Sequence, residues 1–253
     1  MKLLTSLQLA WKVLRLNLHL VSGIVLAYFY LRNGIHQQAT ASAHFIKWNR
    51  GICNIFHAKI TSHGKMQTEP TLYVMNHVSW FDIPVLACQQ PLHFLSKADI
   101  KNWPLIGWLA NRAGTLFIQR GRHGAAQESL EEITNCLQSG GSVVIFPEGT
   151  TTDGKSIKRF HGRLLQSAID AGVKIQPIAL KYPHSLGVNP NVPYIGNMTF
   201  MDSLLGLIRA NPLDVELHFL PPIDIHLAPA SETTNKQLAQ LSHNAIAKQL
   251  ADK

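Results

Sequence analysis

Charged residues and cysteines are both scarce in this chain of 253 residues. Asp, Glu, Lys and Arg make up 15% of it, against about a quarter of an average soluble domain. Next to a hydrophobic content of 46%, this deficit indicates that part of the surface lies out of water. The three cysteines form no Cys-x-x-Cys pair, which excludes a disulfide framework or zinc ribbon and favours a reducing compartment.

Several catalytic and binding motifs are also missing. None of the 13 histidines falls in a His-Glu-x-x-His pattern, so no metal site is predicted. The chain has no Gly-x-Ser-x-Gly, which argues against a serine hydrolase. Its net charge of +8 and pI near 9.5 favour anionic partners. Because no basic run is interleaved with aromatic residues, we expect membrane lipids or phosphorylated substrates and no nucleic acid.

The first 32 residues differ from the rest. Between Arg15 and Arg32 runs "LNLHLVSGIVLAYFYL", a stretch of 16 residues without a permanent charge. A spanning helix usually needs about 20 apolar residues, and apolar and aromatic flanks partly supply them. Lys2, Lys12 and Arg15 precede the stretch, as expected for a cytoplasmic N-terminus. We therefore predict a membrane-embedded or interfacial helix, with a buried core helix as the alternative.

Residues 40–57 gather apolar side chains mostly on one side of a helix. This pattern fits a second membrane-surface helix and an amphipathic helix against the core equally well. We accordingly divide the chain into a membrane-anchoring or interfacial helical segment, residues 1–57, and a main domain, residues 58–253.

From residue 58 the pattern alternates between strands and helices. Strands are expected at 59–63, 71–75, 93–96, 115–119, 142–146, 174–181 and 214–219. Helices are expected near 82–90, 103–112, 124–139, 161–171 and 232–250, the last capped by Ser231, and 184–213 is expected to be irregular. The fold class is therefore α/β: a mostly parallel sheet flanked by helices, with N-terminal membrane-associated helices.

Polar residues follow one of these strands in a suggestive order. "NHVSWFD", residues 76–82, places His77 just past an apolar strand and Asp82 five residues later. The carboxyl ends of strands are where ligand crevices form in open α/β sheets. A tight turn brings the carboxylate to one ring nitrogen and leaves the other free to act as a base. Taken alone, a polar turn without function explains these residues as well.

Three further stretches fit the same edge of the sheet. "LFIQR" delivers Arg120 at the end of a strand, "FPEGT" places Glu148 after another, and "IQPIAL" is a further apolar strand. Strand ends converging from one sheet would gather His77, Arg120 and Glu148 at one rim.

Together the four stretches resemble the 1-acylglycerol-3-phosphate acyltransferase family of glycerolipid acyltransferases, in its signature order over about residues 70–182. The resemblance implies acyl transfer from acyl-CoA or acyl carrier protein to a lysolipid hydroxyl, most simply 1-acylglycerol-3-phosphate giving phosphatidic acid in phospholipid biosynthesis. It implies that His77 is the general base and Asp82 its partner. Substrate contacts would come from Lys97, Arg120, Glu148, Gly149 and Thr150, with no metal and no cofactor beyond the acyl donor.

One position departs from the pattern. Many phosphatidate-forming members continue Glu-Gly-Thr with arginine, whereas this chain has Thr151. The change removes a permanent cation from a place suited to bind phosphate. Either nearby basic residues replace it, namely Lys155, Lys158 and Arg159, or the acceptor is another lysolipid, such as a lysophospholipid or a lyso-ornithine lipid.

Two other classes compete with this interpretation. Residues 149–156, "GTTTDGKS", match the Gly-x-x-x-x-Gly-Lys-Ser pattern of a P-loop NTPase, and "NMTFMD" offers Asp202 as a weak magnesium ligand. A membrane-anchored scaffold without activity would leave His77 and Asp82 purely structural. For the enzyme we expect a membrane location, at the cytoplasmic face of the inner membrane if the protein is bacterial.

Overall fold

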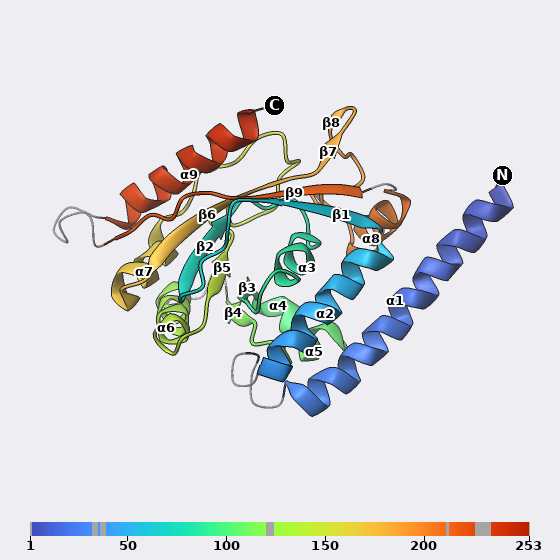
Figure 1. Ribbon diagram of the computed structural model, residues 1–253, viewed down its shortest axis with the longest axis horizontal. Coiled ribbons are helices and arrows are strands. Elements are labelled where there is room, and N and C mark those ends of the chain that lie inside the picture. The colour runs from blue at the N-terminus through green and yellow to red at the C-terminus, as the bar shows by residue number, and fades with distance from the viewer. Residues whose placement is uncertain are drawn as a thin grey trace.

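The computed structural model of the protein describes residues 2–31, 35, 39–119, 124–210, 213–225 and 234–252. Seven of the described strands form one sheet in the order β1-β9-β6-β2-β5-β3-β4 (Figure 1). They are β1 (Ala58–His63), β2 (Thr71–Met75), β3 (His93–Lys97), β4 (Leu116–Ile118), β5 (Val143–Ile145), β6 (Lys174–Lys181) and β9 (Leu213–Phe219). All neighbours run parallel except β6 and β9. The predicted mostly parallel α/β sheet is thus confirmed.

Helices cover both faces of this sheet. One face carries α6 (Ala125–Gln138), α7 (Gln166–Ala171) and α9 (Asn235–Ala251), and the other carries α2 (Ala39–Ile55), α3 (Asp82–Ala87) and α8 (Phe200–Arg209) (Figure 1). Side chains of β2 alternate between two cores. Leu72 and Val74 join the core under α6 and α9, while Tyr73 and Met75 join the core on the α2 side. Burial on both faces explains why "TLYVM" is apolar throughout.

Helices α1 (Lys2–Tyr30) and α2 lie on the face of the sheet that carries α3 and α8, and α1 is the outer of the two (Figure 1). Helix α1 packs against α2, against α5 (Ile106–Arg112) and against α8. Its segment Leu9–Tyr30 is long and apolar enough to cross a membrane, and 11% of its most apolar window is buried. Helix α2 buries Phe45, Ile52 and Cys53 in the core. Helix α2 is therefore an amphipathic helix packed against the core, which is one of the two arrangements that its sequence pattern allowed.

Several element boundaries follow the sequence and others do not. Strands β2 and β6 span the predicted residues, but the stretch predicted as irregular, 184–213, contains α8 and most of a small hairpin of β7 (Pro183–His184) and β8 (Gly187–Val188). Helix α8 begins with a capping box: Asp202 N donates to Thr199 Oγ1 over 3.1 Å and Thr199 N donates to Asp202 Oδ2 over 3.0 Å.

Two predicted helices differ from the observed elements. The range 103–112 contains only α5, preceded by a separate short helix α4 (Ala98–Lys101), and 161–171 contains the 3₁₀ turn η1 (Arg163–Leu165) followed by α7. The cap predicted at Ser231 was wrong, because α9 starts at Asn235 with Thr234 as its capping residue. Ser231 itself lies outside the described residues.

The end of β2 is fixed by a buried asparagine. Asn76 Nδ2 donates to Leu180 O over 3.0 Å, and Leu180 N donates to Asn76 Oδ1 over 2.8 Å. These two bonds join the residue that precedes His77 to β6, the neighbouring parallel strand. The chain after β2 therefore leaves the sheet in a defined direction.

We expect Asn76→Ala to lower the free energy of unfolding by about 2–4 kcal/mol, because it leaves a buried N–H and a buried C=O of Leu180 without their partner. Denaturant unfolding measures the change. Asn54→Ala, at an exposed position of α2, is the matched control and should change the value by less than about 0.5 kcal/mol. Equal effects of the two substitutions would contradict the role assigned to Asn76.

Candidate active site

The His77 and Asp82 side chains contact each other directly. His77 Nδ1 lies 2.7 Å from Asp82 Oδ2. The same oxygen accepts hydrogen bonds from the backbone N–H groups of Val78 and Ser79, over 2.8 and 3.0 Å. The Asp82 side chain is 0% exposed and that of His77 is 19% exposed. The carboxylate is therefore buried in the protein and directed at Nδ1 of a partly accessible imidazole.

A single tight turn creates this arrangement. Asp82 N donates to Ser79 O over 3.2 Å, so residues 79–82 fold back and return the carboxylate to the histidine. The imidazole also stacks on Phe146, just past β5, with ring centroids 3.9 Å apart and an interplanar angle of 17°. Within the described parts of the chain, no group hydrogen-bonds Nε2 of His77. With Nδ1 committed to Asp82, Nε2 is the nitrogen left to exchange a proton with a substrate.

The loop after β5 holds the backbone of His77 on both sides. Glu148 Oε1 accepts from His77 N over 2.9 Å, and its Oε2 accepts from Lys158 N over 2.8 Å. From the same loop, Thr152 N donates to His77 O over 2.8 Å. Gly149 turns the loop with a φ of +70°, which favours glycine. The "FPEGTTT" segment, residues 146–152, therefore positions the histidine by hydrogen bonds to its main chain.

Burial dominates the electrostatics of Glu148. The residue is 4% exposed, and desolvation raises the pKa of its carboxyl above the ordinary value despite the two backbone N–H groups that favour the ionised form. Glu148 thus acts through backbone contacts within the protein.

Of the remaining predicted site residues, the structure describes Lys97, Gly149 and Thr150. Thr150 is exposed beside Gly149. Lys97 ends β3, is exposed, and lines a polar cavity of about 490 Å³ together with Asp99, Lys101 and Gln119. Arg120 lies outside the described residues. The structure therefore brings His77, Asp82 and Glu148 into contact and places Lys97 at the end of a strand separated from β2 by β5.

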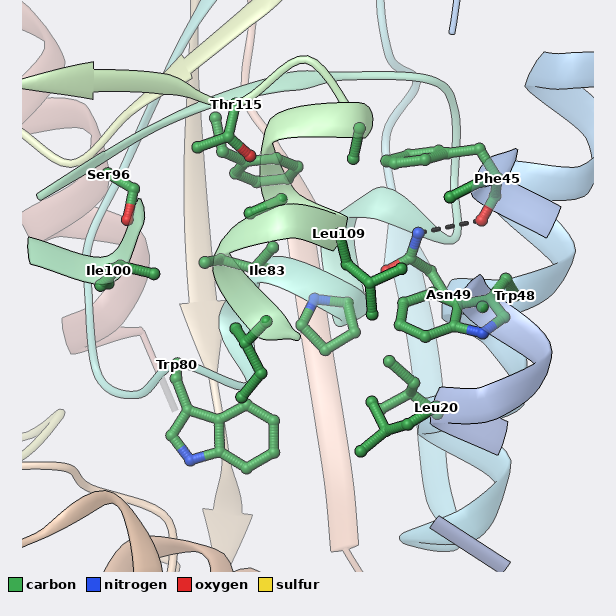
Figure 2. A pocket seen from close by; sticks show the side chains of 18 of the residues that line it. Leu20, Phe45, Trp48, Asn49, Trp80, Ile83, Ser96, Ile100, Leu109 and Thr115 are labelled. Carbon is green, nitrogen blue, oxygen red and sulfur yellow. Dashed lines mark hydrogen bonds between the residues drawn. The ribbon is translucent and has the colours of Figure 1, made fainter. Parts of the chain in front are cut away.

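A second cavity, of about 330 Å³, is almost wholly apolar. Figure 2 shows side chains that line it, with Leu20, Phe45 and Trp48 from the N-terminal helices facing Trp80, Ile83 and Leu109 from the body. It reaches the His77 segment through Trp80 and Tyr194, since Tyr194 N donates to Val78 O over 2.9 Å. The long apolar N-terminal segment thus supplies one wall of a cavity beside the His–Asp pair.

Sequence reasoning missed three residues that touch this site: Phe146, Thr152 and Tyr182. Tyr182 is 1% exposed, and its hydroxyl donates to Asp82 Oδ1 over 2.7 Å. A polar residue directly after a buried strand was the available signal, the same one that marked His77. The partner could not be identified from the sequence, because 100 residues separate Tyr182 from Asp82.

The P-loop interpretation does not fit the structure. The residues that follow Ser156 form no helix before the 3₁₀ turn at Arg163, so no helix N-terminus faces the loop. Asp202 does not end a strand; it caps α8. The loop of residues 149–156 instead helps to hold the main chain of His77.

One group of side chains in the described ranges has ligand spacing for a metal: His63, Glu216 and His218, on β1 and β9. The two imidazoles stack with centroids 4.5 Å apart and planes 10° from parallel. A metal ion binds in the plane of each imidazole through the nitrogen lone pair, and one ion cannot lie in two such stacked planes. This arrangement is therefore not assigned as a metal site.

Fold and site together define a class of protein: an α/β enzyme with a histidine–carboxylate pair at the carboxyl ends of its central strands and an apolar cavity beside it. The chain belongs to the acyltransferase family, as comparison with known proteins establishes. An Acyltransferase family model matches residues 58–181. The family resemblance carried by the four sequence stretches is thus confirmed, and the protein is an acyltransferase.

Curated relatives cover most of the chain. It is 39% identical over 199 residues to the lyso-ornithine lipid O-acyltransferase of Pseudomonas aeruginosa, covering 79% of this chain and 75% of that protein. A 1-acyl-sn-glycerol-3-phosphate acyltransferase of Neisseria gonorrhoeae is 33% identical over 149 residues, 59% of this chain and 58% of the relative. The crystal structure of the 1-acyl-sn-glycerophosphate acyltransferase PlsC from Thermotoga maritima shares the fold, with a TM-score of 0.71, 16% identity and coverage of 100% and 98%.

We expect the stability of the wild type relative to Glu148→Gln to depend on pH. The folded state raises the Glu148 pKa, so it binds a proton more readily than the unfolded chain does. That contribution is complete below the unfolded pKa, near 4.5, and is lost as pH rises through the folded value. Urea unfolding of both proteins, at neutral pH and near pH 4.5, should show the wild type gaining stability over the variant at the lower pH. A constant difference would contradict the assignment.

Proposed function

We propose that the protein transfers a fatty acyl group from a thioester donor to the hydroxyl of a lysolipid, with His77 as the general base and Asp82 as its partner. The observation that carries this proposal is the 2.7 Å contact between His77 Nδ1 and the buried Asp82 carboxylate. It leaves Nε2 as the proton acceptor. Membership of the acyltransferase family supports the reaction class.

The reaction follows from these positions. His77 Nε2 takes the proton of the acceptor hydroxyl while the hydroxyl oxygen attacks the thioester carbonyl carbon. The tetrahedral intermediate collapses, the C–S bond breaks, and the imidazolium returns the proton to the leaving thiolate. Asp82 stabilises the imidazolium that forms. General-base catalysis of this kind contributes about 10²–10⁴-fold in rate.

The apolar cavity is the proposed site for a fatty acyl chain. Its lining comes almost entirely from apolar side chains of α1, α2, α3 and α5 and of the segments around them. Transfer of a chain from water to such a surface is favourable by about 0.8 kcal/mol per buried methylene. Residues Trp80 and Tyr194 connect the cavity to the turn that carries His77, so a bound chain would end near the proposed base.

For the acceptor we propose a lyso-ornithine lipid. Three relatives that each align with 79–81% of this chain carry the name lyso-ornithine lipid O-acyltransferase. The absence of arginine at Thr151 fits an acceptor without a phosphate. An ornithine head group offers a carboxylate and an ammonium, and the polar cavity at the ends of β3 and β4 contains Lys97, Lys101 and the carboxylate of Asp99.

The second candidate acceptor is 1-acylglycerol-3-phosphate, which the name of the Neisseria relative gives as its substrate. Lys155, Lys158 and Arg159 follow the loop and supply the positive charge that a phosphate needs. For either acceptor, Arg120 and Lys97 are proposed to contact the head group, while Glu148, Gly149 and Thr150 shape its pocket. The proposed donor is acyl-CoA or acyl carrier protein, both anionic partners for a chain of net charge +8.

We place the enzyme on the cytoplasmic face of a membrane. Large apolar side chains of α1 are exposed: Leu7, Trp11, Leu14, Leu18, Val21, Val25 and Tyr28, each at least 48% exposed, with the polar Asn17 among them. Since the opposite side of α1 packs on α2, α5 and α8, the helix is proposed to lie in the interface without crossing the bilayer. Residues 1–57 would form this membrane-facing unit and residues 58–253 the catalytic domain.

The function is tested by supplying labelled acyl-CoA or acyl carrier protein with lyso-ornithine lipid, 1-acylglycerol-3-phosphate and lysophosphatidylethanolamine, and identifying the products. We expect acylation of lyso-ornithine lipid by the wild type, and a loss of at least about 100-fold in both His77→Ala and Asp82→Ala. Folded variants that keep a near-wild-type rate would refute the proposed base. Acylation of 1-acylglycerol-3-phosphate alone would show that the proposed acceptor is wrong and that this lipid is the substrate.

Membrane binding is tested on the exposed side of α1. Val21→Glu combined with Val25→Glu should reduce co-flotation with anionic lipid vesicles, because two charges then enter the apolar stripe. Leu241→Glu, at an exposed leucine of α9, is the control and should float like the wild type. Unchanged flotation of the double variant would rule out this surface.

A further inference from the structure

The carboxylate of Asp82 has a second oxygen that the proposed mechanism does not use. Three donors converge on Oδ2, whereas Oδ1 accepts from the hydroxyl of Tyr182 over 2.7 Å. Asp82 is 0% exposed and Tyr182 is 1% exposed. A hydrogen bond to an ionised acceptor is stronger than one between neutral groups, and more so away from water. The phenol is thus a principal neighbour of the charge that orients His77.

The fold holds Tyr182 in this position from both ends. The residue directly follows β6, which pairs with β2 in parallel, so Tyr182 and His77 leave the sheet at the same edge. The bonds between Asn76 and Leu180 fix the two chain segments just before them. Tyr182 O then accepts from Asn189 N over 2.9 Å, beyond the hairpin of β7 and β8. The hydroxyl is therefore presented to Asp82 by a fixed backbone.

We propose that Tyr182 is a positioning residue of acyl transfer: its hydroxyl holds Asp82 in the orientation that His77 requires and draws part of the carboxylate charge away from the imidazole. The inference rests on the proposed role of His77 as the base. Tyr182 acts through Asp82 and touches no substrate.

The chemistry of the surrounding groups supports a fixed donor. Burial, followed by the charge of Asp82, raises the pKa of Tyr182 well above its ordinary value, so the phenol stays protonated and can only donate to the carboxylate. Among the described residues, Cys53 of α2 lies next to Tyr182, and Glu148 lies next to His77 with Lys158 beyond it. Cys53 and Glu148 remain in place when only the phenol oxygen is removed.

The test is Tyr182→Phe, with kcat and the pH dependence of kcat/KM for the acyl donor measured from about pH 5 to pH 9. We expect kcat to fall about tenfold, as for other groups that orient a reactive residue from behind. The acidic limb of the pH profile of kcat/KM should move to higher pH by about half a pH unit, because Asp82 without the tyrosine hydrogen bond stabilises the protonated imidazole more strongly. A purely structural tyrosine would not move the limb.

Tyr73→Phe is the matched control. Tyr73 is also 0% exposed in the same core, and its hydroxyl bonds Gln67 O and Gln90 Nε2, over 3.1 and 2.8 Å, away from Asp82. We expect it to keep the wild-type pH profile. An unshifted limb in Tyr182→Phe, or the same shift in both variants, overturns the proposal.

A second measurement decides the case if Tyr182→Phe does not fold. Site-specific 3-fluorotyrosine at position 182 keeps the ring and makes the phenol a stronger donor, so the acidic limb should move to lower pH. A limb identical to that of the wild type overturns the proposal. His77→Ala separates the two ideas: if it is inactive and the limb never moves, only the role of Tyr182 fails, whereas an active His77→Ala removes the base and Tyr182's role with it.

Discussion

The buried charge of Asp82 is the constraint on which the rest of the site depends. An ionised carboxylate taken out of water is costly unless donors surround it, and here four groups supply them: the His77 ring, two backbone N–H groups and the Tyr182 hydroxyl. Each donor comes from a segment fixed by the central strands β2 and β6. The packing of the sheet and the orientation of the imidazole are therefore parts of one hydrogen-bonded arrangement.

The same edge of the sheet joins two chemically different cavities. One is apolar and lined by α1, α2 and α5, and the other is polar and contains Lys97, Asp99 and Lys101. In the proposed reaction, a fatty acyl chain occupies the apolar cavity and the acceptor head group occupies the polar one. The reacting hydroxyl must then reach the proposed base, His77. The exposed apolar stripe of α1 adds a membrane-facing surface next to the apolar cavity, which links the site of chemistry to the source of the acceptor.

Much of the fold could be predicted because local signals were strong. Strand β2 is a continuous apolar run and β6 is mostly apolar, both with clear ends, and His77 and Asp82 stand in one short turn. Predictions failed where a tertiary contact or a short cap decided the structure. Helix α8 was missed inside a proline-bearing stretch, although Thr199 and Asp202 carry its capping box. Helix α9 begins at Asn235 and is capped by Thr234, not by Ser231.

The sequence by itself determined the α/β class, the His77–Asp82 pair and the family, because these depend on periodicity and on residues close together in the chain. Only the tertiary structure decided that Tyr182 donates the fourth hydrogen bond to Asp82 and that Glu148 and Thr152 hold the His77 backbone. It also decided that α1 and α2 line the apolar cavity. The Glu148–His77 contact joins residues 71 apart in the chain, and the Tyr182–Asp82 contact joins residues 100 apart. No local pattern encodes such distances; the pairing of parallel strands brings the segments together.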